Sequence, residues 1–151
     1  AGIINGKSET EFAPNDIISK AETAVMLARI LDLKTDYKGR LWQDVPQGIW
    51  YEGAANALYV EKLFDGETFN GADGVTMNSL MQILGNYLIK KDNVTFESIT
   101  NNKFNLTAQG AYCVNKGLFL KLLQNGSIDE AHKMTRAETA DVLYRFYRLV
   151  K

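Results

Sequence analysis

Near its two ends the chain carries one short pattern twice, as Ile18-Ser19-Lys20-Ala21-Glu22-Thr23-Ala24 and as Met134-Thr135-Arg136-Ala137-Glu138-Thr139-Ala140. In each copy a hydroxyl residue stands three positions before a glutamate and just ahead of an apolar run. This spacing is typical of the capping box, in which the hydroxyl accepts a hydrogen bond from the glutamate amide and the carboxylate accepts one in return. The pattern therefore predicts a helix start at each place, capped by Ser19 with Glu22 and by Thr135 with Glu138.

A weaker copy of the pattern lies between the other two, and it reads Val75-Thr76-Met77-Asn78-Ser79-Leu80-Met81. Met77 follows Lys20 by 57 residues, and Arg136 follows Met77 by 59. Upstream of the three copies stand turns of similar character: Gly2-Ile3-Ile4-Asn5-Gly6, Lys62-Leu63-Phe64-Asp65-Gly66 and Gly117-Leu118-Phe119-Leu120-Lys121. A steady long period is the sequence signature of a repeat protein. We expect two and a half repeats, at 1–34, 35–91 and 92–151, with the opening helix of the first repeat missing.

Apolar spacing and stop signals predict five helices, near 19–33, 50–63, 77–90, 106–119 and 135–149. Apolar residues make up 46% of the 151 residues and charged residues 23%, which is ordinary globular composition. One short helix pair cannot bury its apolar face alone, so the repeats should share a core. The predicted fold class is all-α, with the whole chain forming one compact domain.

Composition also argues against several functions. The net charge of −1 offers no basic field for nucleic acid, and no apolar run approaches the ~20 residues of a membrane span. The single cysteine, Cys113, cannot form an intrachain disulfide and is expected to be a small buried hydrophobe. The single histidine, His132, is expected at the surface, without further ligands for a metal. We therefore predict no enzyme activity, no cofactor and no metal.

Lys20 and Arg136 occupy an unusual place, because each follows the cap of its helix directly. A cation there is disfavoured by the helix dipole, by ~0.3–1 kcal/mol. With a carboxylate or phosphate bound, the same cation and helix start form a good anion receptor. Two interpretations stay open, an anion site or a solvated side chain. The middle copy has Met77 at this position and so lacks the charge.

These motifs together resemble the S-layer homology family. The matching residues include the turn at 2–6, Phe12-Ala13-Pro14, the two helix-start patterns, Trp42-Gln43-Asp44-Val45 and Trp50-Tyr51. The resemblance implies three motifs with pseudo-threefold symmetry around a central helical bundle. It also implies an extracellular place at the cell wall or S-layer of a bacterium, and binding of secondary cell-wall polysaccharide, often bearing ketal-linked pyruvate, in grooves between motifs.

In the groove between repeats one and two, the resemblance assigns sugar contacts to Lys20, Asp44 and Trp50, with backbone amides from Ser19 and from Asn5 and Gly6. A second groove, beside Met77, lacks both a cation and a tryptophan. The third groove holds Arg136, and it is incomplete unless a partner segment or chain supplies the missing first helix. Lys20 with Trp50 is therefore the expected complete site.

Alternatives remain for single residues and for the whole chain. Asp44 either contacts sugar or caps a turn, Trp50 either binds or packs, and Trp42 and Tyr51 are expected to pack in the core. The expected function is a non-catalytic surface anchor. The alternative is an S-layer lattice or protein-interaction module with degenerate sugar grooves, in which mutational effects would spread over a broad apolar patch.

Overall fold

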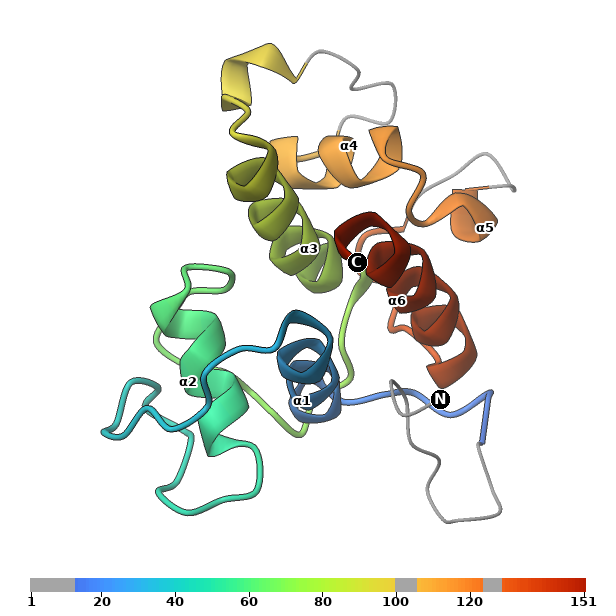
Figure 1. The fold of residues 1–151 in the computed structure, drawn as a ribbon. Coiled ribbons are helices and arrows are strands. Elements are labelled where there is room, and N and C mark those ends of the chain that lie inside the picture. The colour runs from blue at the N-terminus through green and yellow to red at the C-terminus, as the bar shows by residue number, and fades with distance from the viewer. Residues whose placement is uncertain (1–12, 100–105, 124–128) are drawn as a thin grey trace.

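The computed structural model describes residues 13–99, 106–123 and 129–151, and these residues form helices joined by loops (Figure 1). The α-helices are α1 (Lys20–Leu31), α2 (Glu52–Val60), α3 (Met77–Asp92), α4 (Ala108–Asn115), α5 (Leu120–Leu123) and α6 (Arg136–Val150), and a short 3-10 helix spans Phe96–Ser98. Within the described ranges, β pairing is limited to three isolated bridges. The all-α expectation is confirmed.

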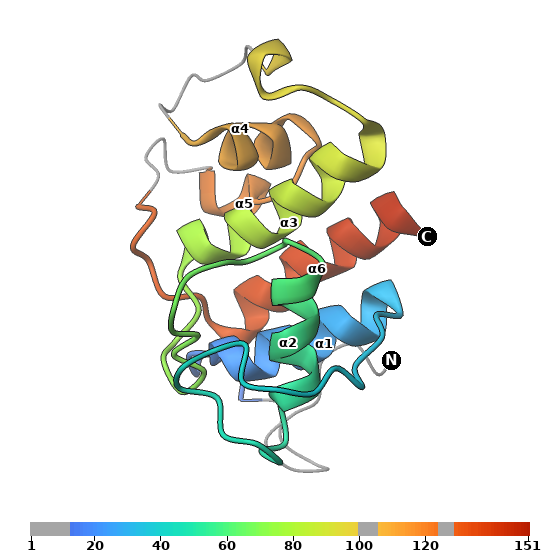
Figure 2. The ribbon, with the colours of Figure 1, turned by 90° about the vertical axis from the view of Figure 1, so that its left-hand side faces the viewer.

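Helices α1, α3 and α6 gather their starts on one side of the molecule and run in the same general direction (Figure 2). The segments before these helices are joined in a ring. The Ile18 amide donates to the Met134 carbonyl at 3.1 Å, Met134 donates to Val75 at 2.9 Å, and Val75 donates to Ile18 at 2.9 Å. All three side chains are fully buried. The ring joins the three helix starts that share the sequence pattern, and the threefold arrangement of repeats stays a prediction.

Two shorter helices lie on the outside, α2 packed against α1 and α4 packed against α3 (Figures 1 and 2). Helix α4 was expected to reach residue 119 but ends at Asn115. The reason is backbone geometry: Gly117 (φ 89°) and Phe119 (φ 64°) adopt left-handed conformations that a helix cannot continue through. The short helix α5, which follows this break, was not predicted.

Trp42 packs against α2 and holds it in place. Its side chain is fully buried, and its indole Nε1 donates to the Ala55 carbonyl of α2 at 2.9 Å. The rings of Phe69 and Tyr59 lie 5.3 and 5.4 Å from the Trp42 ring, between centroids. The expectation that Trp42 belongs to the core is confirmed. Cys113 is likewise buried, and burial raises the pKa of its thiol.

Candidate functional site

Trp50 stands at the surface just before α2, with 65% of the residue exposed. Its indole contacts the ring of Tyr51 edge to face, with 5.0 Å between centroids, and Tyr51 itself is buried. Burying an indole is strongly favourable, so a large exposed tryptophan held in place by a buried neighbour is an unusual surface feature. The arrangement leaves most of the Trp50 side chain available to a ligand.

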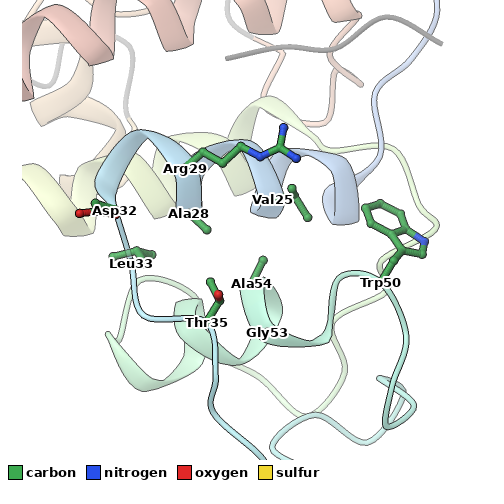
Figure 3. A pocket seen from close by; sticks show the side chains of 9 residues that line it. All are labelled: Val25, Ala28, Arg29, Asp32, Leu33, Thr35, Trp50, Gly53 and Ala54. Carbon is green, nitrogen blue, oxygen red and sulfur yellow. The ribbon is translucent and has the colours of Figure 1, made fainter. Parts of the chain in front are cut away.

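Two pockets meet at Trp50. One, of about 360 Å³, is lined by Ser19, Glu22, Val25, Met26, Arg29, Trp50 and Arg136. The other, of about 390 Å³, is lined by Val25, Ala28, Arg29, Asp32, Leu33, Thr35, Trp50, Gly53 and Ala54 (Figure 3). Because Val25, Arg29 and Trp50 line both, the pockets form one continuous surface along α1, which we call the Trp50 groove.

The Ser19 end of the Trp50 groove contains an ion pair between two helices. Arg136 is 2% exposed, and its Nη1 donates to Glu22 Oε2 at 2.7 Å. The other carboxylate oxygen, Oε1, accepts from the Ser19 amide at 3.1 Å and completes the capping box of α1. Burial raises the pKa of Glu22, but the hydrogen bonds from Arg136 and Ser19 outweigh it and hold this pKa below its ordinary value.

The backbone amides at the start of α1 are already engaged. Besides Ser19, the Lys20 amide donates to the Asp73 carbonyl at 2.9 Å, Ala21 donates to Gly71 at 3.0 Å, and Glu22 donates to the Ser19 hydroxyl at 3.1 Å. The sequence predicted that the capped start at Ser19 would offer amides to a ligand. Carbonyls of the neighbouring loop occupy those amides instead, so a ligand charge at this end has to meet side chains.

Lys20 is not among the residues that line the Trp50 groove, although it follows Ser19 directly. Its Nζ sits 5.7 Å from the centroid of the Phe64 ring. Asp44 is close enough for the Lys20 charge to contribute to lowering its pKa. The structure thus brings Trp50 together with Arg136, which was expected in a different and incomplete groove, and not with Lys20. Arg136 reaches the groove because the ring of helix starts places α6 beside α1.

Asp44 caps a loop of the protein, and the sugar contact that the resemblance assigned to it stays a prediction. Its two carboxylate oxygens accept from the amides of Phe69 and Asn70, each at 2.7 Å. Burial raises the pKa of Asp44, but these two hydrogen bonds and the Lys20 charge outweigh it and lower this pKa. Asp44 therefore holds the loop that follows Phe64 in place. Asn5 and Gly6, the remaining predicted contacts, lie outside the described residues.

The third helix start, at α6, has a different side-chain contact. Glu138 Oε1 accepts from the Thr135 amide at 2.9 Å, which closes the second capping box, and lies 2.8 Å from His132 Nε2. Met77, at the start of α3, is 2% exposed and apolar. His132 was expected to be an ordinary surface residue; its contact with Glu138 was missed, because the two residues belong to different elements.

Arg29 is the groove residue that the sequence analysis overlooked. It lies seven residues after Glu22, which is two helical turns, so both side chains fall on one face of α1. Its side chain is exposed, and among the described residues it has neither an ion-pair nor a hydrogen-bond partner. Helical spacing from Glu22 could have pointed to it.

The described part of the chain lacks two further kinds of feature. No group of three or more His, Cys, Asp or Glu side chains gathers there in a way that could hold a metal ion. Equally, none of the helices described is both long and apolar enough to cross a bilayer.

Comparison with known proteins matches residues 1–24 to the S-layer homology domain. The chain is 29% identical over 82 residues to endo-1,4-beta-xylanase A of Thermoanaerobacterium saccharolyticum, and 29% over 83 residues to amylopullulanase of Thermoanaerobacterium thermosulfurigenes. It is 26% identical over 83 residues to exoglucanase XynX of Acetivibrio thermocellus. These matches cover 53%, 54% and 54% of this chain but only 7%, 4% and 8% of those proteins. Residues 1–24 are thus similar to the S-layer homology domain, a domain type that generally anchors proteins to the cell surface.

Proposed function

We propose that this chain is a non-catalytic anchoring module, which holds a larger protein at the bacterial cell wall by binding secondary cell-wall polysaccharide. The S-layer homology match and the three relatives support a place at the cell surface. The relatives bear the names of polysaccharide-degrading enzymes, and the matched stretch is a small part of each. A module shared with such enzymes but far shorter than they are fits an attachment role. In this proposal residues 1–34, 35–91 and 92–151 are the successive repeats.

The Trp50 groove is the proposed binding site, and the exposed Trp50 at the junction of two pockets is the observation that carries it. An indole face suits the apolar side of a sugar ring. Arg29 adds an exposed guanidinium to this wall, beside the ion pair of Arg136 with Glu22, which fits an acidic sugar such as one bearing pyruvate.

The proposal that the module is non-catalytic rests on its acids. Glu22 and Glu138 complete helix caps, Asp44 caps a loop, and hydrogen bonds lower the pKa of all three below the ordinary value. A glycosidase needs a carboxylic acid with a raised pKa as its proton donor. Acids held in their ionised form and committed to caps are poorly suited to that task.

A second function, a protein-interaction module, is favoured by one feature of α6. Tyr144, Tyr147 and Leu149 on this helix are 55%, 39% and 39% exposed. A partner segment or chain would find exposed aromatic and aliphatic side chains on this surface. The two functions predict different sensitive residues, Trp50 for polysaccharide and Tyr144 for a protein partner.

Sedimentation with purified bacterial cell walls tests the proposal. We expect the full chain to pellet with native walls and to stay in solution with walls stripped of their secondary polymer. Trp50→Ala should abolish pelleting, whereas Tyr144→Ala, which removes another exposed aromatic ring, should leave it unchanged. Equal binding to stripped walls, or loss of binding with Tyr144→Ala alone, would contradict polysaccharide anchoring and favour the protein-interaction function.

A further inference from the structure

We propose that Arg29 is the residue that recognises the negative charge of the ligand in the Trp50 groove, and that it pairs with a sugar-borne carboxylate while the sugar ring lies against Trp50. This inference rests on the proposed function and deepens it, since it assigns the charge recognition to one side chain. Arg136, the cation that the sequence pattern favours, is then a positioning residue for Glu22 and the start of α1.

The two arginines of the groove differ in whether a carboxylate already pairs with them. Arg136 is almost fully buried and donates to Glu22 at 2.7 Å, so its charge is already met by a carboxylate. Pulling it away would leave Glu22 without the hydrogen bond from Arg136, and removing one side of a partly buried charged hydrogen bond is costly. Arg29, by contrast, is exposed and has no ion pair within the described part of the chain. A ligand carboxylate therefore meets Arg29 without breaking an existing pair.

The backbone amides at this end of the groove are already engaged. The amides from Ser19 to Glu22 all donate to carbonyls or side chains of the protein. The helix start thus offers no free amide to an anion, although such starts are often anion sites. A side-chain donor is required, and a planar guanidinium is the group best shaped for two parallel hydrogen bonds to a carboxylate.

The position of Arg29 also suits it to this role. It lines both pockets together with Trp50 and Val25, so it lies where the two halves of the groove meet. Figure 3 shows its guanidinium extending along α1 toward Trp50 and away from Asp32 at the far end. A sugar that carries a carboxylate on one edge could therefore place its apolar face on the indole and its charge at the guanidinium.

Helix α6 provides a matched control. Arg145 follows Arg136 by nine residues, as Arg29 follows Lys20, so the two arginines occupy equivalent helix positions. Arg145 Nε, however, donates to Asp141 Oδ2 at 3.1 Å, and its charge is already paired. If any arginine at this position contributed only by general attraction or helix stability, the two would behave alike.

Calorimetry on the full chain tests the inference with two probes, a pyruvylated monosaccharide and the same monosaccharide without the pyruvate ketal. We expect Arg29→Gln to weaken binding of the pyruvylated sugar about tenfold, which is 1.4 kcal/mol, and to leave binding of the neutral sugar unchanged. Arg29→Lys should recover part of the loss, because it restores the charge without the fork. Arg145→Gln should bind like the parent chain.

Salt provides a readout that a merely structural role would not change. Binding of the pyruvylated sugar by the parent should weaken as salt rises, and this dependence should be largely lost in Arg29→Gln. The inference is overturned if Arg29→Gln binds both probes like the parent, or weakens both equally, or if the parent does not prefer the pyruvylated sugar. The anchoring proposal would survive each of these results so long as sedimentation with native walls still depends on Trp50.

Discussion

The two pairs of inner and outer helices, α1 with α2 and α3 with α4, differ in how closely they approach. A Cβ atom on Gly85 of α3 would lie only 2.5 Å from the Gln109 carbonyl oxygen of α4. Gln109 also donates to the Asn86 side chain at 3.0 Å, and this hydrogen bond further joins α4 to α3. On α1 the position equivalent to Gly85 is Ala28, and here the Trp50 groove stays open.

The residue before each outer helix follows the same division. Trp50 precedes Tyr51, the N-cap of α2, and is 65% exposed, whereas Leu106 precedes Thr107, the N-cap of α4, and is 6% exposed. The third residue of each inner helix also differs, being Glu22 in α1 and Ser79 in α3. One helical plan therefore gives a charged, open groove in one place and a closed contact in the other. A few side chains determine whether the open groove or the closed contact forms.

The largest expected effect concerns how each outer helix is held. Trp42 is fully buried beneath α2 and donates to its Ala55 carbonyl, so Trp42→Ala should lower the free energy of unfolding by about 3–5 kcal/mol. Phe96, the aromatic residue of the short helix before α4, is 53% exposed, and Phe96→Ala should change stability by no more than about 0.5 kcal/mol. Urea denaturation measures both. Equal losses would mean that both outer helices depend on an aromatic anchor. This result would contradict the difference between the pair α1 with α2 and the pair α3 with α4.

The sequence predicted the helix caps well, because helix caps depend on short-range rules. Capping boxes join residues three apart, and both form as predicted at Ser19 and Thr135. The composition of the groove depends instead on which helix start lies beside which outer helix. That order follows from the ring of hydrogen bonds through Ile18, Val75 and Met134, which joins residues far apart in the chain. The family resemblance therefore suggested Lys20 as the partner of Trp50, where the packing supplies Arg136.

A smaller effect should separate the two helix contacts directly. Alanine favours a helix over glycine by about 1 kcal/mol, so Gly85→Ala would stabilise α3 if nothing lay against it. Because the new Cβ would meet Gln109, we expect a net loss of about 1–3 kcal/mol in the free energy of unfolding. The reverse change on α1, Ala28→Gly, should cost only the propensity difference of about 1 kcal/mol. Stabilisation by Gly85→Ala would refute the close approach of α4.

The smallest expected effect concerns the third residue of each inner helix, and it depends on pH. Hydrogen bonds from Arg136 and Ser19 outweigh burial and hold the pKa of Glu22 below its ordinary value of 4.5. A carboxyl whose pKa falls on folding stabilises the folded state above its unfolded pKa, and this stabilisation is lost as the pH falls through the folded pKa. Glu22→Gln should therefore lower the free energy of unfolding at pH 7 by about 1 kcal/mol, a modest amount because Glu22 remains partly exposed.

Below about pH 4.5 the difference between Glu22→Gln and the parent should shrink, since the parent then protonates the same carboxyl. Ser79, at the equivalent position of α3, carries no charge, and its amide donates to the hydroxyl oxygen of the Thr76 cap at 3.1 Å. Ser79→Ala should consequently change stability by an amount that does not vary between pH 7 and pH 3. Urea denaturation of the three chains across this range measures both. If the difference in free energy of unfolding between Glu22→Gln and the parent stayed constant with pH, the negative charge of Glu22 would not contribute to stability. The charged and uncharged helix starts would then be equivalent.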